Sequence, residues 1–303
     1  MPKHFGKCAL CGKECELTYE HIPPRSAFNK EQTKMYTGNE LLADGDRLPW
    51  ETDGLKYINC QQGAGAFTLC KDCNNITGKW YGNSYRYVAY NVAHAIIEWA
   101  DDPEAEAIGI KDVYPLRFIK QVLSMFCSIN NHVSINGYLT SSIPQIDKGQ
   151  QSPLMRTMIE SKIALKNAAK NMDELRAFVL SKDAVGLDKE KFKICMYLTK
   201  SNIYKLNGLT AKLKLEENSY IVLSEITAYP FGFILYFNPP KNFEHQGIDI
   251  TEMADIEYGQ KGTVEFPFDL REMNTYFPND YRTKEKIRED VEKANQWVEE
   301  HQE

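Results

Sequence analysis

Apolar residues recur at helical spacing through the middle of the chain. In residues 83–99, Tyr85, Val88 and Val92 lie three or four positions apart, and Asn83 or Ser84 can cap the start of a helix. Residues 115–129 form a second segment that is apolar on nearly every side, and 152–181 has the pattern of one or two further helices. The central part of the chain is therefore predicted to be helical.

The period then changes to that of strands. Residues 191–204, 209–217, 219–229 and 231–240 alternate or run apolar, and they are separated by turn sequences that contain Asn-Gly and Pro-Phe-Gly. Residues 283–303 return to a charged, amphipathic helical pattern. We expect an antiparallel sheet after the helices.

The first 82 residues differ from both of these regions. They are rich in cysteine, glycine and turn signals, and residues 38–54 have the composition of an irregular inserted loop. The chain is therefore predicted to be α+β, with a small metal-stapled module at 1–82 followed by a larger domain at 83–303, in which helices precede an antiparallel sheet.

Composition places the 303-residue chain among ordinary soluble proteins, with 43% hydrophobic and 26% charged residues. No apolar run approaches the roughly 18 residues that a membrane helix needs, so no membrane partner is expected. The first ten residues lack the apolar core of a signal peptide, and we expect a cytoplasmic protein. In that compartment paired cysteines favour metal binding over disulfides.

The net charge of −6 argues against non-specific binding to nucleic acid. The charge is unevenly distributed, because residues 161–214 hold twelve Lys and Arg against five Asp and Glu. This segment could form a track for nucleic acid or the solvated face of a sheet, and the sequence leaves both interpretations open.

Four cysteines have the spacing of a structural zinc site. Cys8 and Cys11 form one Cys-x-x-Cys pair, and Cys70 and Cys73 form the second. Two such pairs supply a tetrahedral set of four thiolates, which leaves no open position for catalysis. The remaining cysteines are Cys15 and Cys60, which have no partner at the same spacing, and Cys127 and Cys195, which lie in apolar segments typical of a core.

The residues between and after these pairs resemble those of the HNH endonucleases, which are zinc-stapled ββα-metal nucleases. The resemblance covers about residues 5–82 and consists of Cys-x-x-Cys, then Glu20-His21-Ile-Pro, then Cys-x-x-Cys-Asn-Asn, then Gly-Lys. It implies a treble-clef zinc module in which an acidic residue and a histidine lie on one strand of a hairpin, and in which the second cysteine pair starts a helix. Residues 83–303 resemble no family in this way.

The resemblance also implies roles for individual residues. Glu20 matches the acidic ligand of a catalytic divalent ion, Mg²⁺ or Mn²⁺, and His21 matches the general base. Asn74 matches the second ligand of that ion, with Asn75 as its competitor. The candidates for contact with the phosphate are Arg25 and Lys79. The chain departs from the family in having Glu where many members have Asp, and in the 48 residues between His21 and Cys70, which imply an inserted loop.

The chemistry of these side chains agrees with such roles. An unperturbed histidine titrates near pH 6.5 and can accept a proton at neutral pH, and Mg²⁺ prefers carboxylate and amide oxygens. Neighbouring residues on a strand point to opposite faces, however, so Glu20 and His21 cannot both face one flat surface. A bend at residues 22–24, or a place at the edge of a sheet, is required.

Two functions are therefore expected from the sequence. The first is a metal-dependent endonuclease whose favoured substrate is double-stranded DNA, with a role in phage defence or a mobile element by analogy. The second is a non-catalytic zinc module that binds nucleic acid or a protein. In either case residues 83–303 could recognise a nucleic-acid structure, bind a regulatory partner or form a homodimer.

Overall fold

The computed structural model describes residues 3–36, 53–101, 106–141, 153–200, 204–214, 219–241 and 243–268. Within these ranges the protein is mixed α/β, and every pair of strands is antiparallel. The expected helix at 283–303 and nearly all of the expected loop at 38–54 lie outside the described residues.

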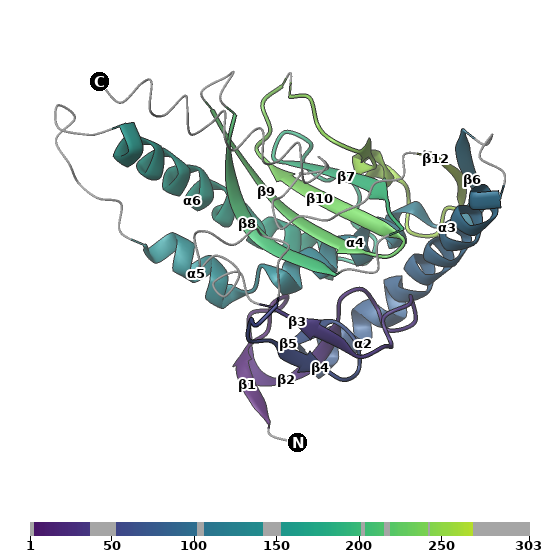
Figure 1. The fold of residues 1–303 in the computed structure, drawn as a ribbon, viewed down its shortest axis with the longest axis horizontal. Coiled ribbons are helices and arrows are strands. Elements are labelled where there is room, and N and C mark those ends of the chain that lie inside the picture. Colours follow the sequence, from purple (N-terminus) through teal and green to yellow (C-terminus); the bar gives the residue numbers. More distant parts are fainter. Residues whose placement is uncertain are drawn as a thin grey trace.

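The N-terminal part of the chain forms a small sheet with a helix packed against it. Strand β2 (Glu14–His21) lies between β1 (His4–Lys7) and β5 (Gly65–Cys70), and helix α2 (Lys71–Thr77) follows β5 directly. Two short strands, β3 (Thr33–Met35) and β4 (Ile58–Cys60), pair separately. Figure 1 shows this group, in purple and dark blue, at one end of the molecule.

Helix α2 continues almost without interruption into the rest of the protein. A π-helical turn, η1 (Gly78–Gly82), joins it to α3 (Asn83–Asp101), so the helix predicted from Ser84 begins within a longer helical stretch. The predicted domain boundary falls between η1 and α3, inside that stretch. The division at residues 82 and 83 stays a prediction.

Helix α4 (Pro115–Ile129) has the bounds that the apolar pattern indicated, and nearly all of its residues are buried. Its first residue is Pro115, which fits the first turn because a proline lacks the N–H that would be unsatisfied there. Helices α5 (His132–Thr140) and α6 (Pro153–Leu180) follow. The sequence did not predict α5, whereas α6 is a single helix over the segment expected to hold one or two.

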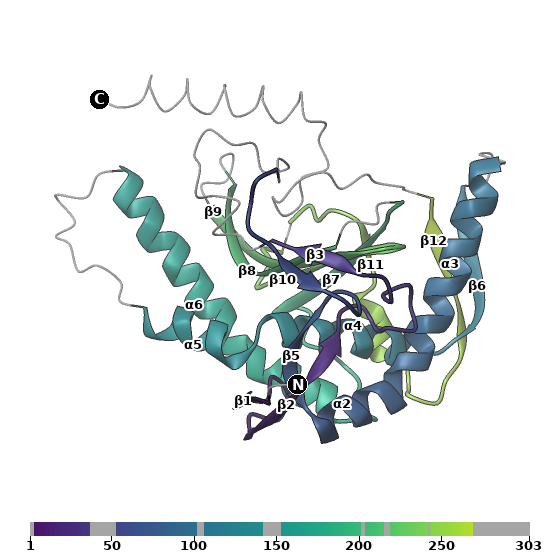
Figure 2. The same ribbon diagram turned by 60° about the horizontal axis from the view of Figure 1, so that its bottom comes forward.

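The large sheet contains the four strands that the change of period predicted. Its order is β11-β7-β10-β9-β8, and the strands are β7 (Phe192–Leu198), β8 (Lys205–Lys214), β9 (Ser219–Ala228), β10 (Phe231–Phe237) and β11 (Ile248–Asp249). A separate pair, β6 (Ala107–Val113) and β12 (Gly262–Pro267), lies beside α3. Figures 1 and 2 show α3 and α6 on opposite sides of the large sheet.

Aromatic side chains fill the space between α3, α4 and the large sheet. The Phe118 ring of α4 lies 5.7 Å from that of Tyr85 and 5.9 Å from that of Phe231, centroid to centroid. All three side chains are fully buried, and the same apolar cluster includes Cys8 and Leu69 of the N-terminal region. One continuous core therefore extends from the cysteines to the sheet.

Polar contacts also join the N-terminal region to the helices. The buried Arg176 of α6 donates from Nε to the carbonyl of Ala9 at 2.8 Å and from Nη2 to that of Asn130 at 2.9 Å. Tyr81 of η1 donates to the carbonyl of Val179 at 2.7 Å. These bonds position the first cysteine turn against α6.

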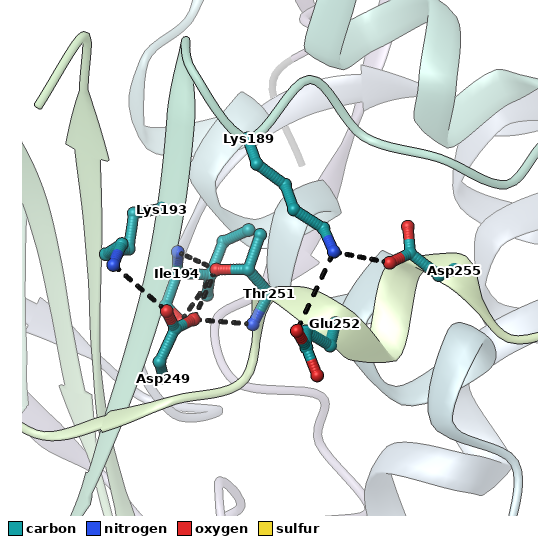
Figure 3. A network of polar contacts seen from close by, with 7 residues as sticks. All are labelled: Lys189, Lys193, Ile194, Asp249, Thr251, Glu252 and Asp255. Atoms are coloured by element: carbon teal, nitrogen blue, oxygen red, sulfur yellow. Dashed lines mark hydrogen bonds and ion pairs between the residues drawn. The ribbon is translucent and has the colours of Figure 1, made fainter. Parts of the chain in front are cut away.

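Several basic residues of segment 161–214 are paired with carboxylates. Figure 3 shows Lys193 beside Asp249 at 3.1 Å and Lys189 beside Asp255 at 2.6 Å, next to the short helix η2 (Thr251–Asp255). Lys191 pairs with Glu174 and Asp188, and Lys205 with Glu225. Each of these four lysines is therefore balanced by a nearby carboxylate. This weakens the interpretation of residues 161–214 as a binding track for nucleic acid. Among the described residues no helix is both long and apolar enough to cross a bilayer.

Candidate metal centre and adjacent polar site

The four predicted cysteines come together. The Sγ atoms of Cys8, Cys11, Cys70 and Cys73 all lie within 4.8 Å of one another, and those of Cys11 and Cys70 are 3.9 Å apart. A tetrahedral zinc site with Zn–S bonds of about 2.3 Å has sulfur atoms about 3.8 Å apart. This cluster could therefore hold a structural metal ion such as zinc.

Backbone turns shape each half of the cluster. In the first turn the Gly12 N–H donates to the carbonyl of Cys8, and Gly12 takes a left-handed backbone with φ of 72°, which glycine adopts at little cost. In the second, the N–H of Cys73 donates to Sγ of Cys70, which also caps α2. The N–H of Cys70 donates to Sγ of Cys8 and links the two halves. Four sulfurs from two distant segments thus meet because β5 delivers Cys70 to the first turn.

The surroundings favour a thiolate at Cys8. A hydrogen bond from the Cys73 thiol and backbone N–H donors, among them that of Cys70, lower the pKa of Cys8 to about 4 although burial opposes this. Thiolate is the form that a metal binds. Cys15 and Cys60 lie outside the four-cysteine cluster, as expected. Cys127 and Cys195 are fully buried, as expected of core residues.

Glu20 is a buried acid near the end of β2. Its side chain is only 6% exposed, and burial raises the pKa of its carboxyl to about 8. Glu20 pairs with Ala66 on the neighbouring strand β5. Gly65, next to Ala66, leaves room for the Glu20 carbonyl oxygen, because a Cβ at Gly65 would lie 2.1 Å from it. Within the described ranges no hydrogen bond or ion pair reaches the Glu20 carboxyl. An acid of this kind calls for a cation or a proton.

His21 is the last residue of β2, and its imidazole is half-buried. Its Nε2 is buried and has no hydrogen-bond partner in the part of the chain that the structure describes. Burial lowers the pKa of His21, and the charge of Arg25 lowers it further. The neutral ring therefore prevails at pH 7.

Glu20 and His21 lie at the end of β2, beyond the part of the strand that pairs with β1. Strand β1 pairs with β2 only as far as Leu17, so Glu20 and His21 are paired on one side alone, with β5. The chain leaves the sheet at Ile22, whose N–H donates to the Ala64 carbonyl. Both side chains are thus at the open end of the sheet.

Helix α2 brings Asn74 to the same strand. Its Nδ2 donates to the Thr18 hydroxyl at 3.0 Å and to the Tyr19 carbonyl at 3.3 Å, the latter being the residue before Glu20. With Nδ2 engaged, Oδ1 is the free end of the amide and accepts no hydrogen bond from the described part of the chain. Asn75 is exposed and makes no such contact with β2. The structure therefore favours Asn74 over Asn75 as a neighbour of Glu20.

The two candidates for contact with the phosphate, Arg25 and Lys79, lie in different places. Arg25 is exposed, and its charge is close enough to lower the pKa of His21. Lys79 instead lines a cavity on another side of the helical stretch, together with residues of α3, α4 and β6. The structure thus brings Arg25, but not Lys79, to the histidine.

One residue of this region was not singled out from the sequence. Asn29 is fully buried, and its Nδ2 donates to the carbonyls of Pro23 at 2.7 Å and Ala64 at 2.8 Å. Its Oδ1 accepts from the N–H of Ala64 at 2.7 Å. These three bonds tie the loop after His21 to the segment before β5. A lone Asn in a loop carries no sequence signal for this role.

Comparison with known proteins adds no relative: no family model, curated protein or solved structure matches this chain.

Proposed function

We propose that the protein is a metal-dependent endonuclease of the HNH type, with His21 as general base and Glu20 and Asn74 as the ligands of a divalent ion. The observation that supports this most strongly is the His21 ring, whose Nε2 has no hydrogen-bond partner among the described residues. An imidazole nitrogen without a partner can take a proton from an attacking water.

The residues around the ring fit a hard cation. Glu20 supplies a buried carboxylate that lacks a partner among the described residues, and Asn74 supplies an amide oxygen, as Mg²⁺ and Mn²⁺ prefer. When bound, such an ion stabilises charge on the phosphate and on the leaving oxygen. Arg25 adds a positive charge near His21 that favours a phosphate there.

The cysteine cluster supports the same proposal in a structural role. In a treble-clef, ββα-metal module a zinc ion would hold the first turn to the start of α2, and so keep Asn74 against β2. Four thiolates leave no site for a reacting water, so the chemistry falls to His21 and its neighbours.

Nucleic acid, with double-stranded DNA favoured, is the proposed substrate, and phage defence or a mobile element is the proposed setting. The direct test incubates the full chain with supercoiled plasmid, single-stranded DNA and RNA, in Mg²⁺ or Mn²⁺. Brief EDTA treatment should stop cleavage, and Mg²⁺ alone should restore it while zinc content stays constant.

His21→Ala should reduce cleavage about 10²–10⁴-fold, as loss of a general base does, with zinc content and circular dichroism unchanged. His94→Ala removes an exposed histidine of α3 and is the matched control. If His21→Ala cleaves as fast as the parent, His21 is not the base and the module is a binding device.

A further inference from the structure

A second polar site lies between η1, α3, α4 and the β6–β12 pair. It is a cavity of about 350 Å³, near the lower end of the roughly 300–1,000 Å³ found for small-molecule sites. Its lining includes Lys79, Arg117 and Lys261, with Asp112 as the acid among the lining residues. Lys261 pairs with Asp112 at 3.2 Å, which leaves Lys79 and Arg117 as the lining cations without a carboxylate in the cavity. In a chain whose net charge is −6, this positive excess marks a site for an anion.

Arg117 contacts two aromatic rings and a backbone carbonyl. Its guanidinium carbon lies 3.8 Å from the centre of the Tyr114 ring and 4.1 Å from that of Tyr258, and its Nε donates to the Tyr258 carbonyl at 2.9 Å. The two rings hold the planar group in place, and no described residue accepts from its Nη atoms. A fixed guanidinium with free N–H groups suits two oxygens of a phosphate.

Aromatic side chains form much of the remaining wall. Trp80, Tyr87 and Tyr114 all line the cavity, and Tyr87 is 43% exposed. The Tyr87 hydroxyl donates to the Lys111 carbonyl at 3.2 Å, which ties the ring to strand β6. Rings held at the mouth of a basic cavity provide a surface on which a base can stack.

We propose that this cavity binds a nucleotide, with its phosphate on Arg117, Lys79 and Lys261 and its base against the aromatic wall. The volume matches one nucleotide unit better than a longer ligand. That unit can be a free mononucleotide or one residue of a single strand. The site uses none of Glu20, His21 and Asn74, so the proposal does not depend on the nuclease activity.

Calorimetric titration of the full chain, without added divalent ions, tests the proposal with three probes: adenosine monophosphate, inorganic phosphate and a single-stranded DNA hexamer. Adenosine monophosphate should bind at one site per chain, and inorganic phosphate at least about 10-fold more weakly, because the base adds stacking. A hexamer about 10-fold tighter than the mononucleotide would identify a strand as the source, and equal or weaker binding would identify a free nucleotide.

Variants locate the binding. Lys261→Glu, at an exposed residue, should weaken the mononucleotide at least about 10-fold, whereas Lys170→Glu, an exposed lysine of α6 outside the lining, should leave it within about twofold. Tyr87→Ala should weaken binding about 5- to 100-fold and Tyr87→Phe should retain it, since the ring is kept. Equal affinity for phosphate and nucleotide, no binding of either nucleotide probe, or no effect of Lys261→Glu would each overturn the proposal.

Discussion

Two regions of the molecule each bury a glutamate, and they treat it in opposite ways. In the large sheet Glu225 is fully buried, with Lys205 at 2.9 Å and the Tyr197 hydroxyl at 2.9 Å. At the end of β2 Glu20 is nearly as buried, yet no described residue bonds to its carboxyl. A buried carboxyl with a cationic partner is a common structural feature, whereas burial without one raises the pKa of Glu20 and makes this acid a candidate for function.

The regions also differ in what holds them together. The sheet is packed with aromatic rings, and Tyr197 lies so close to Gly232 of β10 that a Cβ there would meet the ring at 1.7 Å. The N-terminal sheet has few large apolar residues and relies on four cysteines and on the three hydrogen bonds of Asn29.

The largest expected effect comes from removing the proposed metal. Cys70→Ser should lose zinc and unfold the N-terminal region, because three thiolates do not complete the tetrahedron and metal binding supplies about 10–16 kcal/mol in small zinc peptides. Metal analysis and hydrogen exchange of residues 3–36 check this. Cys15→Ser and Cys60→Ser are the controls, and zinc at one atom per chain in Cys70→Ser would contradict the assignment.

In the sheet, Glu225→Ala should destabilise the protein by about 3–5 kcal/mol, since it strands the buried charge of Lys205. Denaturant unfolding measures the loss. Replacing both partners, as Lys205→Met with Glu225→Leu, should recover much of it. A single variant as stable as the parent would show that the pair is not the buried contact described above.

The opposite outcome is expected at Glu20. Glu20→Gln removes an unpaired buried carboxyl, so the thermal midpoint should stay equal or rise, while cleavage in Mg²⁺ falls about 10²-fold or more. Stability gained together with activity lost is the signature of a functional acid. A fall in stability as large as that of Glu225→Ala would mean that Glu20 has a structural partner instead.

The pH dependence of stability should distinguish the parent protein from Glu20→Gln. The pKa of Glu20 is raised from 4.5 to about 8 in the folded state, so its burial costs nothing below pH 4.5 and costs increasingly more as pH rises towards 8. Without added Mg²⁺ the parent should therefore lose stability between pH 6 and pH 8, and Glu20→Gln should lose less. Urea midpoints across that range decide, and parallel curves would refute the raised pKa.

The smallest effect is expected at Arg25. Arg25→Ala should raise KM a few-fold through loss of a phosphate contact, and should raise the pKa on the acidic limb of the pH–rate profile because the Arg25 charge lowers that of His21. Lys79→Ala is the matched control, because Lys79 lies in the cavity with Arg117 and away from His21. It should leave the acidic limb of the pH–rate profile unchanged. A shift in the opposite direction would mean that Arg25 does not act on His21.

Much of the fold follows from local pattern. The bounds of α4 and β9 match their apolar periods closely, because such patterns depend on neighbours within one element. Strands β7 and β10 begin within one residue of where predicted but end six and three residues early. Helix α5 and the β6–β12 pair were not predicted. These elements are short, and their sequences mix polar and apolar residues without a clear period. Strand β6 pairs with a segment about 150 positions later, so its formation depends on a long-range contact.

For the site, the sequence by itself identified the four cysteines at spacing two, which the structure brings together, and it proposed an acid–base pair in Glu20 and His21. These are short-range features of the sequence, and they can be recognised without knowing the fold that brings the two cysteine pairs together. Tertiary structure decided the rest, because burial and proximity depend on segments far apart in the chain. It placed Asn74 rather than Asn75 against β2, left Glu20 without a described partner, and moved Lys79 away from His21 into a cavity with Lys261.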